Sequence, residues 1–329
     1  MALAAQGAGD ALWCPEWREA DGEATIKQRT AVDTPLLFYC SWFCPFAQRA
    51  WIALEEKGVP YRYVEINPYE VDPREPGGYT KRPLKLEVKQ AKYPDFVASS
   101  PRGLVPALNN AGQRVWESLQ VIEYVDEKFP SGPSLMPADP HKRAMVRVWA
   151  AHCTDRIQKA YYSMLMEQDA AKQIEMREQF FTECRALARA MDPSGPFFLG
   201  KDFSMLECAF APFWQRCIWV GSYYRDLQFP QDVDFERLDR WWTATSTRPS
   251  VARTFVCKER LISSYKQYSQ NKGTTDYAAS IQAGLSAASR ANFKMASEAT
   301  SSLLRGSVLP LAVVALFGAG WLAAKRRAA

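Results

Sequence analysis

The amino-acid sequence predicts an α/β domain at about residues 34–130, followed by an all-helical domain at about 141–268. In the first domain, an apolar run at 36–39 and a run rich in aromatic and β-branched residues at 61–66 are typical of strands. A helical pattern lies between them. Strand, helix and strand within about 30 residues form a βαβ unit with a parallel pair of strands. Beyond residue 141 the strand patterns stop and long helical patterns take over, which predicts the second domain.

The helix between the two strands is predicted to run from about residue 45 to about 57. Pro45 suits the first helical position, and Gly58 suits the position just past the end. Cys44 then occupies the N-cap, where free backbone N–H groups and the positive end of the helix dipole favour a thiolate. This setting predicts a thiol pKa that falls toward neutrality. A buried, inert cysteine that closes a turn is the alternative.

The rest of the first domain is predicted from its turns and strand patterns. Residues 67–91 are rich in proline, glycine and charge, which predicts a long surface loop. The stretches 99–108 and 114–116 follow and predict two short strands joined by a turn at 109–112. Glu117-Ser118 then opens a helix. Serine is a good N-cap residue, so a simple helix cap is one interpretation of this pair.

The second domain begins after a linker at 131–140 that is dense in proline and glycine. Its longest helical patterns lie at 141–166 and 172–191. Ser204 and Glu207 have the spacing of a capping box, which predicts another helix start. The aromatic residues of this domain are expected in its core more often than in a ligand pocket; they include Trp149, Tyr161, Tyr162, Trp214, Trp219, Trp241 and Trp242.

Charge and composition exclude two classes of function. The formal net charge is +5, from 41 basic and 36 acidic residues, and three of the basic residues lie within 325–329. The remaining sequence lacks the basic surface that nucleic-acid binding requires. The eight cysteines do not have the short paired spacings of zinc sites, and there are two histidines. We therefore expect no metal cofactor.

The two ends of the sequence differ from the domains between them. Residues 1–33 form a polar extension without the basic start and apolar core of a secretion signal, so we expect a folded part in the cytosol with reduced thiols. Residues 269–305 are rich in small polar residues and are predicted to be a linker or a weak helix. Residues 306–324 carry no charge and precede a basic tail at 325–329. This pattern predicts a single-pass transmembrane anchor, with a buried globular helix as the alternative.

Four matches connect this chain with a known family. They are Cys44-Pro45-Phe46-Ala47-Gln48-Arg49, Gly103-Leu104-Val105-Pro106, Glu117-Ser118, and Lys92 in Lys92-Tyr93-Pro94-Asp95-Phe96. With these motifs in this order, the sequence resembles the cytosolic glutathione transferases, most closely the omega class, over about 35–265. The resemblance implies a thioredoxin-like α/β domain that binds glutathione, followed by an all-α domain, which is the glutathione transferase architecture.

The resemblance also implies a role for each match. Cys44 would be the catalytic thiol, and glutathione would be the co-substrate. The residue before a cis proline would pair its backbone with the glutathione cysteine, the Glu-Ser pair would hold the γ-glutamyl end, and a lysine would meet the glycine carboxylate. A serine hydroxyl and N–H groups at a helix start suit a carboxylate, and a glutamate suits an amine. The glutathione-binding residues implied in this way are Lys92, Val105, Pro106, Glu117 and Ser118.

A cysteine at position 44 implies a particular reaction. Family members with tyrosine or serine there activate glutathione toward electrophiles, whereas a cysteine attacks a disulfide or an oxidised substrate and becomes joined to glutathione. We therefore expect thioltransferase or reductase chemistry on a small oxidised or disulfide substrate, such as deglutathionylation or dehydroascorbate reduction. Cys40 is a candidate resolving thiol, although a strand residue of this kind usually points into the core.

A non-enzymic member of the same fold is the competing interpretation. Chloride intracellular channel proteins share a similar cysteine motif, and ganglioside-induced differentiation-associated proteins share a C-terminal membrane anchor. The complete set of glutathione contacts favours an enzyme. Because the family usually dimerises, a homodimer is expected. The anchor would leave the catalytic domain facing the cytosol, on the mitochondrial outer membrane or the peroxisome rather than on the ER.

Overall fold

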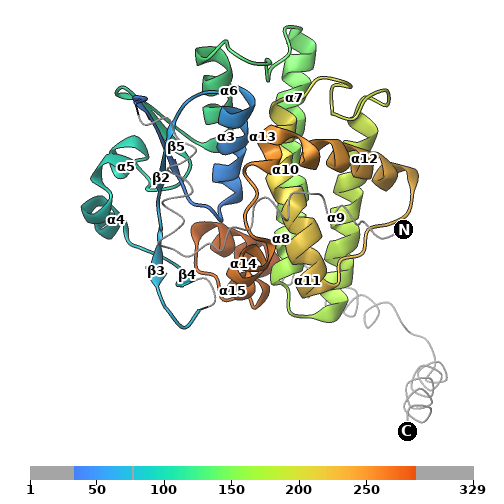
Figure 1. Cartoon of the computed structure of the whole chain (residues 1–329). Helices are drawn as coiled ribbons and strands as arrows, with labels where there is room; N and C mark the ends of the chain where they lie inside the picture. Colours follow the sequence, from blue (N-terminus) through green and yellow to red (C-terminus); the bar gives the residue numbers. More distant parts are fainter. Residues whose placement is uncertain (1–32, 76–77, 287–329) are drawn as a thin grey trace, which may run out of the picture. The chain divides into compact units, whose positions relative to one another are not determined.

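The computed structural model of the chain describes residues 33–75 and 78–286. Of these, residues 33–75 and 78–281 belong to one compact unit, and residues 282–286 belong to a second. The elements that follow lie in the first unit, where they are coloured along the sequence in Figure 1.

A four-stranded sheet forms the base of the N-terminal half. Its strands are β1 Leu36–Cys40, β2 Arg62–Glu65, β5 Ala107–Asn110 and β6 Gln113–Trp116. They lie in the order β2–β1–β5–β6. β1 is parallel to β2 and antiparallel to β5, and β5 is antiparallel to β6. The parallel pair confirms the predicted βαβ unit, and with the hairpin it makes the expected thioredoxin-like sheet.

The helix that follows β1, α3 (Pro45–Glu56), begins and ends where the sequence predicts. Proline suits the first helical position because its missing N–H needs no partner there. Gly58 follows the helix with a φ of +61°, a left-handed conformation that glycine adopts without a steric cost. α3 packs against α6 (Ser118–Lys128) and against α10 (Met205–Arg216) of the helical half. It therefore lies between the two halves of the unit (Figure 1).

The hairpin between β5 and β6 is tighter than predicted. Asn109 and Asn110 continue β5 and pair with both of its neighbouring strands. The turn consists of Ala111 and Gly112, with φ values of 50° and 91°. A two-residue hairpin turn of type I′ requires positive φ at both positions. The predicted turn at 109–112 is therefore wrong at its first two residues.

The segment predicted to be a long surface loop, residues 67–91, contains regular structure instead. It holds a two-stranded antiparallel sheet and a short helix, and a further helix follows. The rings of Tyr69 and Tyr79 pack on one another and on the ring of Phe43. These long-range contacts stabilise a hairpin that the local content of proline, glycine and charge does not reveal. The elements are β3 Tyr69–Val71, β4 Tyr79–Pro83, α4 Leu86–Lys92 and α5 Pro94–Ser99.

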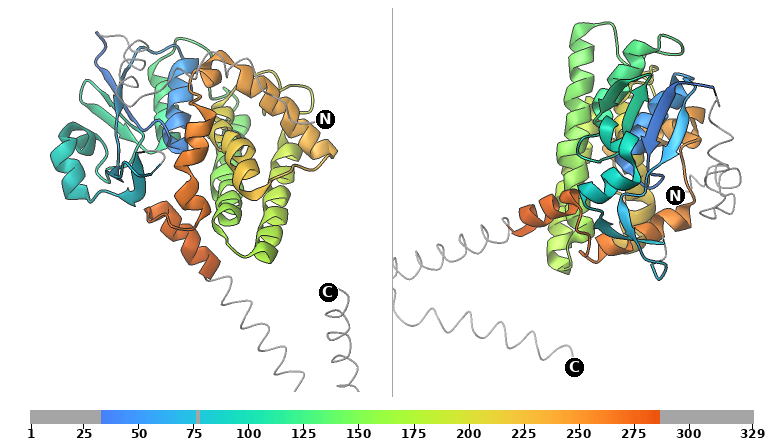
Figure 2. Two further views of the ribbon diagram at one scale, coloured as in Figure 1. Left: turned by 60° about the horizontal axis from the view of Figure 1, so that its bottom comes forward. Right: turned by 90° about the vertical axis from the view of Figure 1, so that its left-hand side faces the viewer.

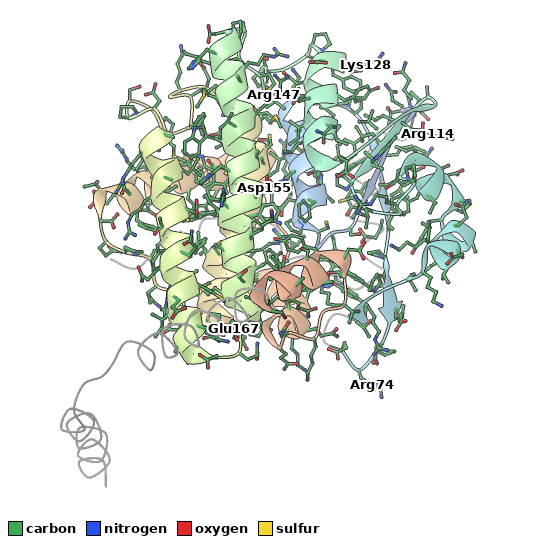
Figure 3. The ribbon with its side chains drawn as sticks, turned by 180° about the vertical axis from the view of Figure 1, so that it is seen from behind. Arg74, Arg114, Lys128, Arg147, Asp155 and Glu167 are labelled. Atoms are coloured by element: carbon green, nitrogen blue, oxygen red, sulfur yellow. The ribbon has the colours of Figure 1, made fainter. Side chains whose placement is uncertain are left out.

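The C-terminal half is helical, as predicted. Its first three elements form one long rod over the predicted range 141–166, and a π-helical turn, η1, lies in the middle of the rod (Figure 2, right). In Figure 3 the labelled Arg147, Asp155 and Glu167 follow one another along this rod. The bounds are α7 Pro140–His152, η1 Cys153–Gln158, α8 Lys159–Met166, α9 Ala170–Ala190, η2 Cys217–Gly221, α11 Ser222–Arg225, α12 Val233–Thr247, α13 Pro249–Ala252, α14 Lys258–Ser264 and α15 Lys266–Ser269.

The predicted capping box opens α10. The Ser204 side chain accepts from the backbone of the first helical turn, and the Glu207 side chain accepts from the Ser204 backbone N–H. Both halves of the capping box are therefore present. Glu207 is fully buried, and its carboxylate also accepts from the Phe198 N–H at 2.8 Å and from Trp241 Nε1 at 3.2 Å. Burial raises the pKa of this carboxyl, and the hydrogen bonds from the Ser204 hydroxyl and N–H, the Phe198 N–H and the Trp241 indole act in the opposite direction. Glu207 therefore connects α10, α12 and the loop before α10.

A buried arginine of α3 joins the two halves. Arg49 Nε donates to the carbonyl of Ala209 in α10 at 2.8 Å, and its Nη2 donates to Thr154 Oγ1 in η1 at 2.8 Å. Its Nη1 donates to Ser118 Oγ at the start of α6 at 3.3 Å. Burial lowers the pKa of Arg49 to about 10, so the side chain stays charged at neutral pH. These contacts fix the start of α6 relative to α3.

Several predicted segments lie outside the described residues. They are the polar extension at 1–33 except Asp33, the part of the linker beyond residue 286, the anchor at 306–324 and the tail at 325–329. Within 33–75 and 78–286 no helix combines the length and the apolar character that a membrane span requires.

Candidate active site

A cavity of about 630 Å³ lies between the two halves of the unit. Its walls come from the start of α3, the β3–β4 hairpin, the loop before β5, the turn from β6 into α6, and the helices α8 and α15. Residues 275–277 and 280 contribute to a further side. Five of the six site residues expected from the sequence line this cavity: Cys44, Val105, Pro106, Glu117 and Ser118.

Cys44 occupies the N-cap of α3, as predicted. Burial raises the pKa of the Cys44 thiol above its usual value. The backbone amides of Ala47 and Phe46 act in the opposite direction, and so do the charges of Arg216 and Lys81. The predicted fall of the pKa toward neutrality is therefore wrong for this structure, because desolvation of the sulfur outweighs the helix start.

Arg216, at the end of α10, places a positive charge beside the backbone that leads into Cys44. The side chain is fully buried, and its Nη2 donates to the carbonyl of Phe43 at 3.0 Å. Its Nη1 donates to Gln48 Oε1 at 2.8 Å, and its Nε donates to Tyr265 Oη at 2.9 Å. The arginine thus ties the residue before Cys44 to the helical half, a contact that local sequence patterns do not signal.

The Val105–Pro106 peptide bond is cis, as the resemblance implies. The loop before it is held by Ser100, whose Oγ donates to the Leu104 carbonyl at 2.7 Å and accepts from the Leu104 N–H at 3.1 Å. Among the described residues, neither the N–H nor the C=O of Val105 has a hydrogen-bond partner. This peptide edge is available to a ligand in the manner of a strand partner.

The Glu117-Ser118 pair does not form a side-chain cap on α6. Glu117 is the N-cap residue and Ser118 is the first helical residue, and no side-chain cap hydrogen bond is present at this helix start. Glu117 has a φ of +69°, a left-handed conformation that costs a residue with a Cβ free energy, and such outliers concentrate at functional sites. Ser118 Oγ accepts from Arg49, and the Glu117 carboxylate lies 3.7 Å from Arg102 Nη1. The cap interpretation is therefore wrong.

The sixth expected residue, Lys92, lies outside the cavity. It is exposed at the end of α4, with its Nζ over the ring of Tyr93 at 5.1 Å. Two other lysines line the cavity. Lys89 is buried and donates from Nζ to the Gly103 carbonyl at 3.0 Å, and Lys81 is buried on β4. The sequence pattern indicated Lys92 rather than Lys81 or Lys89. It did not reveal that the 67–91 segment folds into a hairpin and a helix, which bring the other two lysines to the cavity.

The other described cysteines are free thiols, and Cys40 is the one nearest to Cys44 in sequence. Cys40 lies on β1 and is fully buried, and burial raises its pKa well above the usual range. This placement agrees with the expectation that its side chain points into the core. Within the described residues no group of three or more His, Cys, Asp or Glu side chains is arranged to hold a metal ion.

An aromatic wall completes the cavity on the side of the helical half. Its rings belong to Phe46, Tyr162, Tyr265, Tyr268 and Tyr277. Tyr277 lies within the segment predicted to be a linker at 269–305, whereas the structure includes residues up to 281 in the compact unit. Aromatic residues of the helical half therefore line the cavity as well as the core. Their spacing in the sequence does not show which of them do which.

Comparisons with known proteins agree with this architecture. Residues 43–128 match the model of the glutathione S-transferase N-terminal domain, and residues 149–244 match that of the C-terminal domain. The rice protein IN2-1 homolog A is 31% identical over 248 residues, which cover 75% of this chain and 84% of the rice protein. Glutathione S-transferase L3 of Arabidopsis thaliana is 30% identical, over 77% of this chain and 95% of its own length.

A solved structure gives the same result. The crystal structure of glutathione transferase Omega 3C from Trametes versicolor is similar with a TM-score of 0.62 and 32% sequence identity. The similarity covers 77% of this chain and 97% of the Trametes chain. The two halves described above therefore have counterparts over nearly the whole length of that protein.

Proposed function

This chain belongs to the glutathione S-transferase family, and on that premise we propose that it is a glutathione-dependent thioltransferase or reductase that works through a mixed disulfide between Cys44 and glutathione. Glutathione is the co-substrate of this family. Within the family we propose the omega type, a class that the similarity to the Trametes Omega 3C structure supports. Deglutathionylation and dehydroascorbate reduction are the reactions that suit this type.

The observation that carries the proposal is a cysteine at the N-cap that faces the cavity. A hydroxyl at such a position only activates the glutathione thiol, whereas a cysteine attacks a disulfide sulfur and becomes covalently joined to glutathione. Two cations, Arg216 and Lys81, favour the thiolate form of Cys44. The thiolate is the reactive form, so their presence supports a nucleophilic role for the sulfur.

The remaining cavity residues suit the recognition of glutathione. The Val105 peptide edge would pair with the backbone of the tripeptide, and the N–H groups at the start of α6 and the Ser118 hydroxyl would hold the γ-glutamyl carboxylate. The exposed carboxylate of Glu117 would hold the γ-glutamyl amine. The aromatic wall would accept the second substrate. A scaffold protein has no need for all of these contacts, which favours an enzyme over a non-enzymic member of the fold.

A comparison of two reactions tests the proposed function. The purified chain should reduce a glutathionylated peptide in the presence of glutathione faster than it conjugates glutathione to an aryl halide, when both rates are expressed relative to the uncatalysed reaction. The expected order follows from the covalent role of the cysteine sulfur. The opposite order would indicate a conjugating transferase, and the lack of both reactions would support a non-enzymic protein.

We also propose that residues 306–324 anchor the protein in a membrane, with the catalytic domain facing the cytosol, on the mitochondrial outer membrane or the peroxisome. The support is the uncharged run that precedes the basic residues at 325–329. The full chain should stay with membranes after a carbonate wash, and deletion of 306–329 should release an active enzyme. Added protease should digest the catalytic domain in intact organelles. Recovery of the full chain in the wash would contradict the anchor, and a protected domain would contradict the orientation.

A further inference from the structure

Lys81 is a buried lysine in the candidate active site that the family motifs do not include. Its side chain lines the cavity that holds Cys44, and the residue is only 4% exposed. The Nζ atom lies 4.4 to 5.8 Å from the centres of five aromatic rings, which we call the aromatic cage. The cage consists of Phe43, Tyr69, Tyr79, Tyr265 and Tyr268.

The backbone of Lys81 is fixed by a distant part of the chain. Its N–H donates to Gln267 Oε1 at 2.7 Å, and its carbonyl accepts from the Thr274 N–H at 3.2 Å. These partners come from α15 and from the segment that follows it. The lysine is therefore held from both sides, and its position in the cavity does not depend on the β3–β4 hairpin alone.

Lys81 and Cys44 act electrostatically on one another. Among the described residues no carboxylate and no hydrogen-bond acceptor is paired with its Nζ. Burial lowers the pKa of Lys81 to about 7, the Cys44 thiolate acts to raise it, and the charge of Arg216 acts to lower it further. In return, the Lys81 charge lowers the pKa of the Cys44 thiol. The charge of each group therefore affects the pKa of the other.

The phenols of the aromatic cage and the Cys40 thiol do not compete with this pair for a proton near neutral pH. Burial raises the pKa of each phenol of the aromatic cage and of the Cys40 thiol, so these groups stay neutral. Arginine side chains keep their charge. The titratable and charged groups that act on Cys44 or Lys81, or line the same cavity, are Cys40, Arg49, Tyr69, Tyr79, Lys89, Arg102, Glu117, Tyr162, Arg216, Tyr265, Tyr268, Asp276 and Tyr277.

We propose that Lys81 is the proton-exchange partner of Cys44: its amine takes the thiol proton as the thiolate forms and returns a proton to the thiolate that leaves the substrate. A cation in an aromatic cage is stabilised without a carboxylate that would compete for it. The ammonium form can therefore add to the positive charge that Arg216 already brings to bear on Cys44. The first half of this proposal concerns Cys44 alone, and the second half rests on the proposed thioltransferase reaction.

The reaction balances in two steps. The thiol proton moves to the Lys81 amine, and the Cys44 thiolate attacks the glutathione sulfur of a mixed disulfide. A bond forms between the two sulfurs as the substrate disulfide breaks, and the electron pair leaves on the substrate sulfur, which takes the proton from Lys81. A second glutathione then gives its thiol proton to the amine and attacks the Cys44 adduct. Glutathione disulfide leaves, and Cys44 regains its proton from Lys81.

The rate at which iodoacetamide alkylates Cys44 as a function of pH tests the first half of the proposal. Lys81→Met should lower this rate below pH 7, where the Lys81 ammonium is present to favour the thiolate, by about tenfold if the charge lowers the pKa of Cys44 by one unit, and the two profiles should converge at higher pH. The rates are measured on the full chain by site-resolved mass spectrometry, which separates Cys44 from Cys257. Lys92→Met is the control, since Lys92 is a lysine of α4 that lies outside the cavity and is not among the main charges acting on Cys44. Its profile should equal that of the wild type.

The Lys81→Arg variant separates charge from proton exchange. This variant keeps a cation that cannot give up its proton, so the alkylation of Cys44 should be at least as fast as in the wild type while the turnover of a glutathionylated peptide falls by about tenfold. Wild-type turnover in Lys81→Arg would overturn proton exchange, and a wild-type alkylation profile in Lys81→Met would overturn the whole proposal. If the wild type shows no turnover but Lys81→Met alters alkylation, the proposed function fails and the pairing of Lys81 with Cys44 stands.

A measurement without Lys81 variants covers the case in which they do not fold. The titration of the Lys81 side chain is followed by NMR of ¹³C-lysine-labelled protein in the wild type and in Cys44→Ser. Because coupling between two sites is reciprocal, loss of the thiolate should move the Lys81 titration to lower pH. An unchanged Lys81 titration in Cys44→Ser would overturn the pairing.

Discussion

Replacement of Cys44 by serine should lower glutathione-dependent disulfide reduction by about 10³-fold or more, as expected when the nucleophile of a covalent mechanism is removed. The oxygen of serine cannot form the mixed disulfide, and the small change in size should leave α3 and the cavity intact. The measurement is the turnover of a glutathionylated peptide at saturating glutathione, together with the thermal unfolding of the variant.

The matched control for this prediction is Cys40→Ala. Cys40 is a second cysteine at the same end of β1, fully buried and with a pKa raised by burial, so it should not take part in the chemistry. The alanine variant should keep most of its turnover while it loses some stability. An equal loss of turnover in both variants would contradict the single-thiol mechanism and indicate a dithiol.

The largest loss of stability is expected from Glu207→Ala. The buried carboxylate accepts hydrogen bonds from the N–H and hydroxyl of Ser204, from the Phe198 N–H and from the Trp241 indole. Alanine would leave these donors unpaired and create a cavity, which should lower the free energy of unfolding by about 3–5 kcal/mol. Urea denaturation of the full chain measures the change.

Two variants calibrate this result. Glu259→Ala removes an exposed glutamate from the first turn of α14 and should change the free energy of unfolding by no more than about 0.5 kcal/mol. Ser204→Ala removes the cap and one of the four donors to Glu207 while the other three remain, and should cost about 1 kcal/mol. If Glu207→Ala were no less stable than Ser204→Ala, the capping box would be a local helix signal without the wider role in packing that the contacts indicate.

The local signals of the sequence predict much of the fold and part of the site. The start and end of α3 depend on Pro45 and Gly58, residues that act on their own backbone. The cis peptide before Pro106 and the capping box at Ser204 are equally local. Each of these features needs only a few neighbouring residues, so a short sequence pattern is sufficient to find it.

The features that the sequence does not predict depend on long-range contacts. Lys81 enters the cavity because its backbone binds Gln267 and Thr274, nearly 200 residues away, and because aromatic rings from four segments surround it. The pKa of the Cys44 thiol rises because burial disfavours the thiolate. A helix start can be found in the sequence, but the solvent exposure of the atom that it faces depends on the whole fold.

The central claim is that Cys44 carries glutathione as a covalent adduct during turnover. The most direct test is to mix the full chain with a glutathionylated peptide, stop the reaction with acid, and locate the adduct by mass spectrometry of the digested protein. The account predicts one glutathionyl group on Cys44, which disappears when reduced glutathione is added. Turnover that proceeds while Cys44 remains an unmodified thiol throughout would contradict it.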